Sequence, residues 1–178
     1  MIFEETDINE VYLIESDYFT DVRGSLTKTF SEELFLKNRI PTTFKESFFS
    51  VSAKNVIRGM HLQVAPSECS KLVYVASGEI LDVVVDLRAN SPTFGQHISY
   101  VLSQKNHKGL LVPEGCAHGF LSLTDNACTV YMQTEMRDVE AEAGVHYDSF
   151  GMDWGVTSPI LSERDKALPS LKEYEQKM

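Results

Sequence analysis

The sequence predicts an all-β protein built as a sandwich or barrel of short strands, and three observations support this fold class. β-branched and aromatic residues gather in short runs, turn residues separate these runs at close intervals, and only two segments carry signals for the start of a helix. The 178 residues contain no internal repeat, no low-complexity stretch and no linker. We therefore expect a single domain over residues 1–178.

The expected strands follow one another along the chain as far as residue 133. They cover Val11–Ile14, Leu26–Phe30, Phe48–Ser52, Leu72–Ala76, Ile80–Leu87, Ile98–Leu102, Leu110–Val112, Phe120–Leu123 and Cys128–Gln133. Turn signals lie between them at Asp21–Gly24, Ser77–Gly78, Asn90–Pro92, Pro113–Gly115 and Asp125–Asn126. The run from residue 80 to residue 87 is apolar apart from Asp82 and Asp86, as expected of a strand deep in a sandwich.

Two segments are expected to be helical. Ser31 followed by Glu32 and Glu33 combines an N-cap residue with acids in the first turn. Ser162 opens a second helical stretch near the C-terminus. The charged segment Lys172–Met178 that follows is expected to be a solvated or frayed end.

Charge and composition exclude several classes of function. The chain has 16 Lys and Arg against 26 Asp and Glu, a net charge of −10, which argues against broad nucleic-acid binding and against docking on an anionic membrane. No apolar run reaches the roughly 18 residues of a membrane span, and the first residues lack the basic region and apolar core of a signal peptide. The three cysteines at unrelated spacings, Cys69, Cys116 and Cys128, indicate reduced thiols of a cytoplasmic protein.

The segment from Pro113 to His118 resembles the second signature of cupin jelly rolls. In that signature, turn residues direct the following strand so that its histidine points into the mouth of the barrel. The alternative is a turn followed by a histidine that packs in the core.

A second histidine lies in the strand Ile57–Gln63, where a period of two places Gly59, His61 and Gln63 on one face. Metal-binding cupins usually carry a second histidine where this chain has Gln63. His61 and His118 without a third donor make a poor zinc or iron site, so we expect no metal. A histidine without metal in an apolar barrel mouth is either a core residue or a base, because its unperturbed pKa of about 6.5 suits proton abstraction.

An ordered set of motifs runs nearly from end to end of the chain. It comprises Asp21–Gly24, Val56–Gln63, Lys71–Val73, Gly78–Arg88, Ser91–Gly95, Pro113–Phe120, Tyr131, Glu142–Val145, Asp153–Trp154 and Leu161–Lys166. This set resembles the dTDP-4-dehydrorhamnose 3,5-epimerase family. The resemblance implies a cupin-type jelly-roll β-sandwich with short flanking and C-terminal helices, and a homodimer. It also implies epimerisation of 4-keto-6-deoxy sugars carried on a nucleoside diphosphate, with no metal or organic cofactor.

The reaction of this family needs a base, an acid on the opposite face, and groups that stabilise an enolate oxygen, because the C3 and C5 protons lie next to a C4 ketone. By the resemblance, His61 is the base, Asp165 its carboxylate partner and Tyr131 the acid. Ser162 and Asp165 also fit a helix-capping pattern, so Asp165 could instead cap a helix. Tyr131 could be an ordinary strand tyrosine, although alternation places it with Thr129 and Gln133 on one face.

The resemblance also assigns substrate-binding residues. Arg23 and Arg58 match positions that hold the diphosphate, and Lys71 matches a position near the sugar oxygens and the enolate. Each of these cations could instead pair with a surface carboxylate. His118 matches a histidine that contacts the sugar, oriented by Asp82 or a neighbour. Two further expected substrate-binding residues lie in matching motifs, Glu142 and Arg164.

The chain departs from the family pattern at the nucleotide end. Lys28 stands where the family has a glutamate that touches the base. Glu46 and Phe48 replace a glutamine and an asparagine, while Met136 and Arg137 replace an aromatic pair of which one member stacks on thymine. The planar guanidinium group of Arg137 can also stack on a base. Lys28, Glu46 and Phe48 occupy the other altered positions, so we include all four among the expected substrate-binding residues.

These departures leave several alternatives open. The nucleotide could be dTDP, GDP or CDP, and the sugar could be a hexose or a heptose. The reaction could invert C3 alone or both C3 and C5, or could move the ketone as a keto-isomerase does. A cupin that binds a nucleotide sugar without catalysis and a metal-dependent cupin oxygenase are the alternatives from other functional classes.

Overall fold

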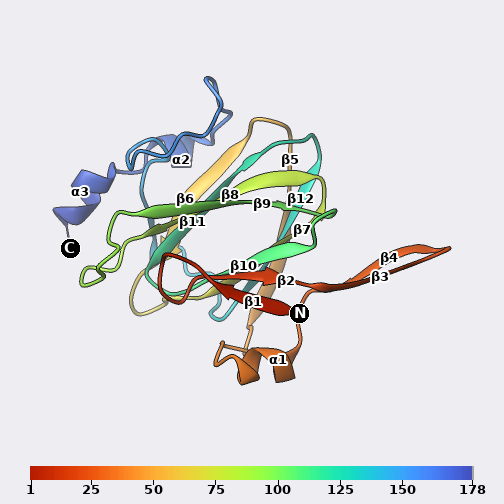
Figure 1. The fold of residues 1–178 in the computed structure, drawn as a ribbon. Helices are drawn as coiled ribbons and strands as arrows, with labels where there is room; N and C mark the ends of the chain where they lie inside the picture. Colours follow the sequence, from red (N-terminus) through yellow and green to blue (C-terminus); the bar gives the residue numbers. More distant parts are fainter. Residues whose placement is uncertain (178) are drawn as a thin grey trace.

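Two antiparallel sheets pack face to face in the computed structural model, which describes residues 1–177 (Figure 1). The six-stranded sheet has the order β1 (Ile2–Glu5), β2 (Tyr12–Glu15), β10 (Lys108–Val112), β7 (Lys71–Ser77), β12 (Ala127–Gln133) and β5 (Glu46–Ser52). The five-stranded sheet has the order β13 (Glu142–Gly144), β6 (Ile57–Gln63), β11 (Cys116–Ser122), β8 (Glu79–Asp86) and β9 (His97–Ser103). The predicted all-β, cupin-type jelly-roll sandwich is confirmed.

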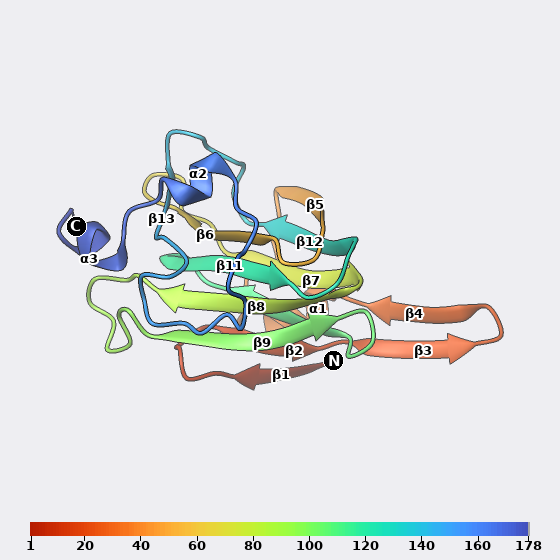
Figure 2. The same cartoon turned by 90° about the horizontal axis from the view of Figure 1, so that it is seen from above.

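A hairpin projects from the sandwich. Its strands β3 (Asp17–Asp21) and β4 (Gly24–Lys28) pair only with each other, and both views show them extending away from the rest of the chain (Figures 1 and 2). The predicted turn at residues 21–24 closes this hairpin. The arrangement leaves large apolar side chains in solvent, with Phe19 64% and Leu26 62% exposed.

Three apolar clusters hold the fold together. The first lies between the sheets and joins residues such as Val73 and Leu110 of one sheet to Val84 and Phe120 of the other. The second covers the outer face of the five-stranded sheet with the C-terminal segment, which includes Trp154. The third fastens the helix near residue 35 against the six-stranded sheet. Both faces of β8 are buried, which explains why most residues of this strand are apolar.

Every expected strand is present, with ends that differ from the prediction by a few residues. Three observed strands, β1, β3 and β13, were not predicted. β1 and β3 are largely exposed and carry little apolar alternation, while β13 has only three residues. Their pairing partners stabilise them rather than their own sequence pattern.

Three short helices flank the sandwich: α1 (Glu32–Lys37), α2 (Glu163–Lys166) and α3 (Leu171–Glu175). Ser31 occupies the expected N-cap position of α1, but its side chain makes no capping hydrogen bond. The segment from Lys172 is largely solvated, as expected, but it is not frayed over α3. Ser170 and Glu173 form a capping box there, and Leu171 and Tyr174 pack against the second apolar cluster. Met178 lies outside the described residues.

The three cysteines are free thiols, as predicted. Burial raises the pKa of Cys69, and raises the pKa of Cys116 to about 12, so both thiols stay protonated near neutral pH.

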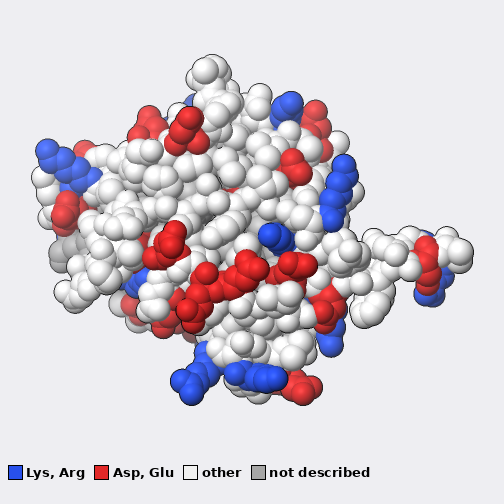
Figure 3. All heavy atoms as spheres, in the orientation of Figure 1, with Lys and Arg blue, Asp and Glu red and all other residues white. Residues whose placement is uncertain are grey.

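Among residues 1–177, no helix combines the length and the apolar character that crossing a membrane requires. Acidic side chains gather around β1 and β2 on the face that Figure 3 shows. That face has no continuous basic surface of the kind that a nucleic-acid backbone requires.

Candidate active site

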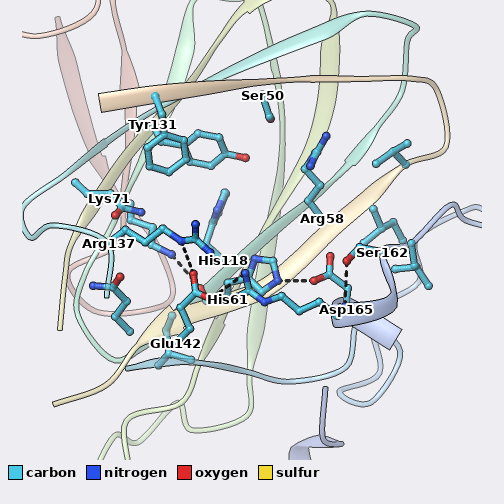
Figure 4. A pocket seen from close by; sticks show the side chains of 18 of the residues that line it. Ser50, Arg58, His61, Lys71, His118, Tyr131, Arg137, Glu142, Ser162 and Asp165 are labelled. Atoms are coloured by element: carbon cyan, nitrogen blue, oxygen red, sulfur yellow. Dashed lines mark hydrogen bonds and ion pairs between the residues drawn. The ribbon is translucent and has the colours of Figure 1, made fainter. Parts of the chain in front are cut away.

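A cavity of about 770 Å³ opens between the two sheets, next to the loop that leads into α2 (Figure 4). Strands of both sheets line it together with that loop. It brings together all the expected site residues except two, namely Glu46, Phe48, Arg58, His61, Lys71, His118, Tyr131, Arg137, Glu142, Arg164 and Asp165. Such a volume suits a small-molecule ligand.

Strand alternation directs the β12 side chains into the cavity. Thr129, Tyr131 and Gln133 are buried while the residues between them are partly exposed, which confirms the predicted shared face. In the sheet register, Tyr131 lies opposite Phe48 of β5. Gln133 lies opposite Lys71 of β7. The six-stranded sheet therefore supplies a continuous row of chemically active side chains along one wall.

A bulge in β6 directs the side chains of the opposite wall. His61 pairs with His118, yet Arg58 pairs with Phe120, so β6 has one more residue than β11 between the two pairs. The extra residue brings Arg58 and His61 to the same side, although strict alternation would separate them. The predicted face of Gly59, His61 and Gln63 is thus wrong at Gly59, which does not line the cavity.

The bulge also depends on glycine. Gly59 has a φ of +133°, and a Cβ there would lie 2.5 Å from Cα of Gly119 in β11. Only glycine combines this conformation with so close an approach of two backbones.

His61 and Asp165 form a hydrogen-bonded pair on one side of the cavity. Nε2 of His61 lies 2.7 Å from Oδ1 of Asp165, and the other carboxylate oxygen accepts a hydrogen bond of 3.3 Å from the Gly59 backbone N–H. Helix capping is carried out by Ser162, whose hydroxyl oxygen accepts from the Asp165 backbone N–H at 3.1 Å. The Asp165 backbone is therefore part of the helix start, while its side chain is committed to the histidine.

The electrostatics of this pair favour a neutral imidazole beside an ionised carboxylate. Burial lowers the pKa of His61, and the hydrogen bond to Asp165 opposes this without reversing it. Burial raises the pKa of Asp165, but its hydrogen bonds with His61 and Gly59 outweigh burial and hold the pKa below its ordinary value. Since an ionised carboxylate only accepts, Nε2 of His61 carries the hydrogen and Nδ1 is left as the basic nitrogen.

Tyr131 faces this pair from the other sheet, and its hydroxyl points into the cavity (Figure 4). Burial raises the pKa of Tyr131 well above that of a free tyrosine, so the phenol stays protonated. The ring stacks on Phe48 and meets His118 edge to face. His118 is in turn held by Asp82, with 2.8 Å between Nε2 and Oδ2, so of the expected partners, Asp82 or a neighbour, the structure shows Asp82. Burial raises the pKa of Asp82, and the contact with His118 opposes it.

Two cations in the cavity have no carboxylate partner among residues 1–177. Lys71 is buried, and its Nζ donates only to the His61 carbonyl oxygen, at 3.2 Å. Burial lowers its pKa. Arg58 donates from Nε to the Ser52 hydroxyl at 3.0 Å. The alternative of a surface ion pair is therefore not observed for either residue, and both charges are available to an anionic ligand.

Close to His61, Glu142 links two arginines (Figure 4). Its carboxylate lies 2.8 Å from Nε of Arg137 and 3.1 Å from Nη1 of Arg164 (Figure 4). Glu46 also contacts this group, since its carboxylate accepts from the Arg137 backbone N–H at 3.3 Å. The network holds two guanidinium groups at the rim.

Arg23 and Lys28 are the two expected site residues that the structure does not bring to the cavity. Both lie in the projecting hairpin, and neither lines the cavity of its own chain. Arg23 forms an exposed ion pair with Asp21, which is the alternative noted for it from the sequence.

The cavity also contains residues that the sequence did not single out as site residues. Ser50 and Gln133 could have been found by extending the alternation from Phe48 and Tyr131 by two residues. Ile160 and Leu161 belong to the loop before α2. Leu161 opens the motif Leu161–Lys166, whereas no local pattern marks Ile160.

The Gln63 side chain holds a loop by three hydrogen bonds. Its amide nitrogen donates to the carbonyl oxygens of Ser67 and Met136, and its amide oxygen accepts from the Asp138 backbone N–H. Within the described part of the chain, no three His, Cys, Asp or Glu side chains are grouped as a metal site requires.

Comparison with known proteins agrees with this geometry. Residues 5–173 match the family described as dTDP-4-dehydrorhamnose 3,5-epimerase. The enzyme of that name from Methanothermobacter thermautotrophicus is 38% identical over 96% of this chain and 95% of its own length.

Solved structures show the same similarity. The dTDP-4-dehydrorhamnose 3,5-epimerase of Bacillus anthracis, with TDP and PPi bound, has a TM-score of 0.91 at 38% identity and covers 95% of this chain and 98% of its own. A 3'-monoepimerase from Streptomyces bikiniensis in complex with dTDP-quinovose has a TM-score of 0.91 at 28% identity, over 96% of this chain and 88% of its own. The fold, the shared motifs and these similarities agree, and the chain belongs to the dTDP-4-dehydrorhamnose 3,5-epimerase family, a family of isomerases.

Proposed function

We propose that this chain epimerises a 4-keto-6-deoxy or related 4-keto sugar carried on a nucleoside diphosphate, inverting C3, C5 or both. The observation that carries the proposal is the placement of the His61–Asp165 pair and Tyr131 on opposite sheets, facing one cavity. Inversion at a carbon next to a ketone needs a base and an acid on opposite sides of that carbon. The two sheets supply one each.

His61 removes the proton. Nδ1 takes the hydrogen of C3 or C5 as that C–H bond breaks, and its electron pair moves into the ketone to form an enolate. Asp165 stabilises the imidazolium that results and keeps the ring in the tautomer that leaves Nδ1 free. The lowered pKa of His61 keeps the base neutral at physiological pH.

Tyr131 returns a proton from the opposite side. The enolate carbon takes the phenol hydrogen, the C=O bond re-forms, and the centre is inverted. The tyrosinate that remains then regains a proton while the imidazolium loses one, which restores both groups. The strongly raised pKa of Tyr131 makes its anion costly, so the tyrosinate is promptly reprotonated.

Lys71 and His118 stabilise the negative charge that develops on the ketone oxygen, while Arg58 keeps its expected role of holding the diphosphate. Lys71 suits this role because it is buried and carries no compensating carboxylate in the described chain. A fixed cation in a cavity that excludes water stabilises an enolate far more than it would in bulk solvent.

The nucleoside diphosphate is proposed to bind toward the rim, where Glu142 holds Arg137 and Arg164. Guanidinium groups form paired hydrogen bonds with phosphate oxygens. Two of the similar structures contain TDP or dTDP-quinovose, which makes a dTDP sugar the first candidate. Arg137 keeps GDP- and CDP-linked sugars as alternatives, because it stands where the family has an aromatic pair.

We also propose that the chain works as a homodimer in which the hairpin reaches the partner subunit. The hairpin carries Arg23 and Lys28 away from the cavity of its own chain, and it exposes Phe19 and Leu26. Exposed apolar side chains on a projecting element mark a contact surface. In the dimer, Arg23 would add a positive charge to the cavity of the partner.

The proposed function is tested with dTDP-, GDP- and CDP-linked 4-keto sugars in heavy water, followed by proton NMR. An epimerase incorporates deuterium at C3 or C5 and yields the inverted sugar. Movement of the ketone would instead identify a keto-isomerase. If calorimetry detects binding but none of the three nucleotide-linked sugars takes up deuterium from the solvent, the result would contradict catalysis and support a binding module.

A further inference from the structure

Phe48 contacts the proposed acid directly. Its ring lies 4.9 Å from that of Tyr131, centroid to centroid, with 18° between the planes, so the two rings are stacked. The pair belongs to one register position of neighbouring strands, where Tyr131 of β12 lies opposite Phe48 of β5. From the sequence, Phe48 was assigned to the nucleotide end, but the structure places it at the reacting end.

A second ring limits the position of Tyr131. His118 meets it edge to face, with 6.0 Å between centroids and 76° between planes. His118 is itself buried and fixed by its hydrogen bond to Asp82. Phe48 is the less restrained neighbour, because its side chain lies at the cavity wall and the residue is 39% exposed. The Tyr131 ring is therefore held between two rings, of which His118 is fixed and Phe48 is less restrained.

We propose that Phe48 is a positioning residue that fixes the plane of the Tyr131 phenol and thereby sets how often the enolate is protonated on the inverting face. This inference rests on the proposed function. Proton transfer depends steeply on geometry, and a displacement of about 1 Å can cost about 100-fold in rate. An enolate that Tyr131 fails to protonate can be reprotonated by His61 on the original face. When the imidazolium has first traded its proton for a solvent deuteron, this return gives exchange without inversion.

The experiment measures two quantities on the same carbon, deuterium exchange from solvent and net inversion. In Phe48→Leu, an apolar side chain remains but the stacking surface is lost. We expect exchange to stay within about twofold and the ratio of inversion to exchange to fall about tenfold. Phe48→Tyr keeps an aromatic ring and should restore the ratio.

Phe49→Leu is the matched control. Phe49 is the next residue of β5, is 67% exposed and does not line the cavity. The same substitution there should leave the ratio unchanged. If Phe48→Leu leaves the ratio unchanged, or lowers exchange and inversion together, the inference is wrong.

A readout without substrate separates this inference from the proposed function. With tyrosines labelled for NMR, and the Tyr131 signal identified by Tyr131→Phe, the ring resonance should shift in Phe48→Leu but not in Phe49→Leu. A wild-type chain that exchanges no deuterium would end the proposed function and the catalytic part of the inference. An unshifted resonance would instead show that Phe48 does not order the ring.

Discussion

Burial acts on His61 and Tyr131 in ways that serve opposite tasks. It lowers the pKa of the imidazole, which leaves a neutral base, and it raises the pKa of the phenol, which leaves a protonated acid. If the proposed function holds, burial in one cavity thus prepares both partners in the state from which each would react. The surroundings of the two side chains differ in one respect: His61 has a buried carboxylate, Asp165, within hydrogen-bond distance, and Tyr131 has none among residues 1–177.

Substitutions at these two residues should separate exchange from inversion. His61→Asn removes the base, and we expect solvent exchange at C3 and C5 to fall by about 100- to 10,000-fold. Tyr131→Phe leaves the base in place, so exchange should persist while inversion is lost. NMR in heavy water measures both quantities. Wild-type exchange in His61→Asn would show that another group is the base.

The pH dependence follows from the direction of the two pKa shifts. The base must be neutral, so kcat/KM should fall as pH decreases through the His61 pKa, with a midpoint below the ordinary value of about 6.5. The acid must be protonated, so no alkaline loss from Tyr131 is expected below its ordinary pKa of about 10. A pH profile of kcat/KM measures both limits.

Asp165→Asn is the control for the acidic limit. Asp165 raises the pKa of His61, so its neutralisation should move the midpoint to still lower pH. A midpoint at or above pH 6.5 in the wild type would contradict the assignment of His61 as a desolvated base.

The sequence could predict residues whose role depends on their own chemistry and position in a motif. His61, Asp165, Tyr131 and Lys71 lie in segments that resemble the family, and all four line the cavity. The partner of Phe48 was not predictable, because the stacking depends on which β5 residue the register places opposite Tyr131. Residue identity shows what a side chain can do, while strand pairing decides what it touches.

At the scale of elements, the bulge in β6 is the feature on which the site depends most. Simple alternation predicted the strand itself but placed Gly59 where Arg58 lies. A bulge is created by the pairing of two strands, so the sequence of β6 alone does not reveal it. The order in α3 was missed for two reasons. The pattern Ser170-x-x-Glu173, a capping box that the sequence displays, was not used, and contacts with the distant Trp154 cluster also stabilise the helix.

Gly59→Ala tests the importance of the bulge. The added Cβ would require a φ that side chains rarely adopt and would lie 2.5 Å from Cα of Gly119. We expect a loss of roughly 1–3 kcal/mol in the free energy of unfolding, together with loss of activity as His61 moves relative to Asp165. Chemical denaturation and the exchange assay measure the two effects.

Gly151→Ala provides the comparison. Gly151 also has a positive φ, of +81°, but a Cβ there would meet no atom within 4 Å. This variant should show the cost of the backbone conformation alone and retain its exchange rate. Equal losses of stability and activity in both variants would show that the close approach to Gly119 is unimportant.

At the scale of the whole molecule, the projecting hairpin separates Arg23 from the cavity that its sequence motif suggests. A mixture of two impaired variants can show whether the partner supplies it. With Arg23→Ala and His61→Asn refolded together in equal amounts, half of the dimers contain one chain of each kind. The intact His61 of one chain is then completed by the intact Arg23 of the other, so about one quarter of wild-type activity should return.

Light scattering of the wild type should show a dimer. Activity in the mixture that does not exceed the average of the separate variants would place Arg23 outside the partner's cavity. A monomer by light scattering would remove the basis for the shared site.

The proposed base and its carboxylate are separated by 104 positions along the chain. On a ribosome, the imidazole therefore emerges long before the group that orients it, and the sandwich strands are already synthesised when Asp165 appears. Proteolytic loss of the segment that carries α2 would leave nearly all of the β framework while removing half of the dyad. An activity assay would therefore detect the loss of this segment, whereas a spectroscopic measurement of β-strand content would barely change.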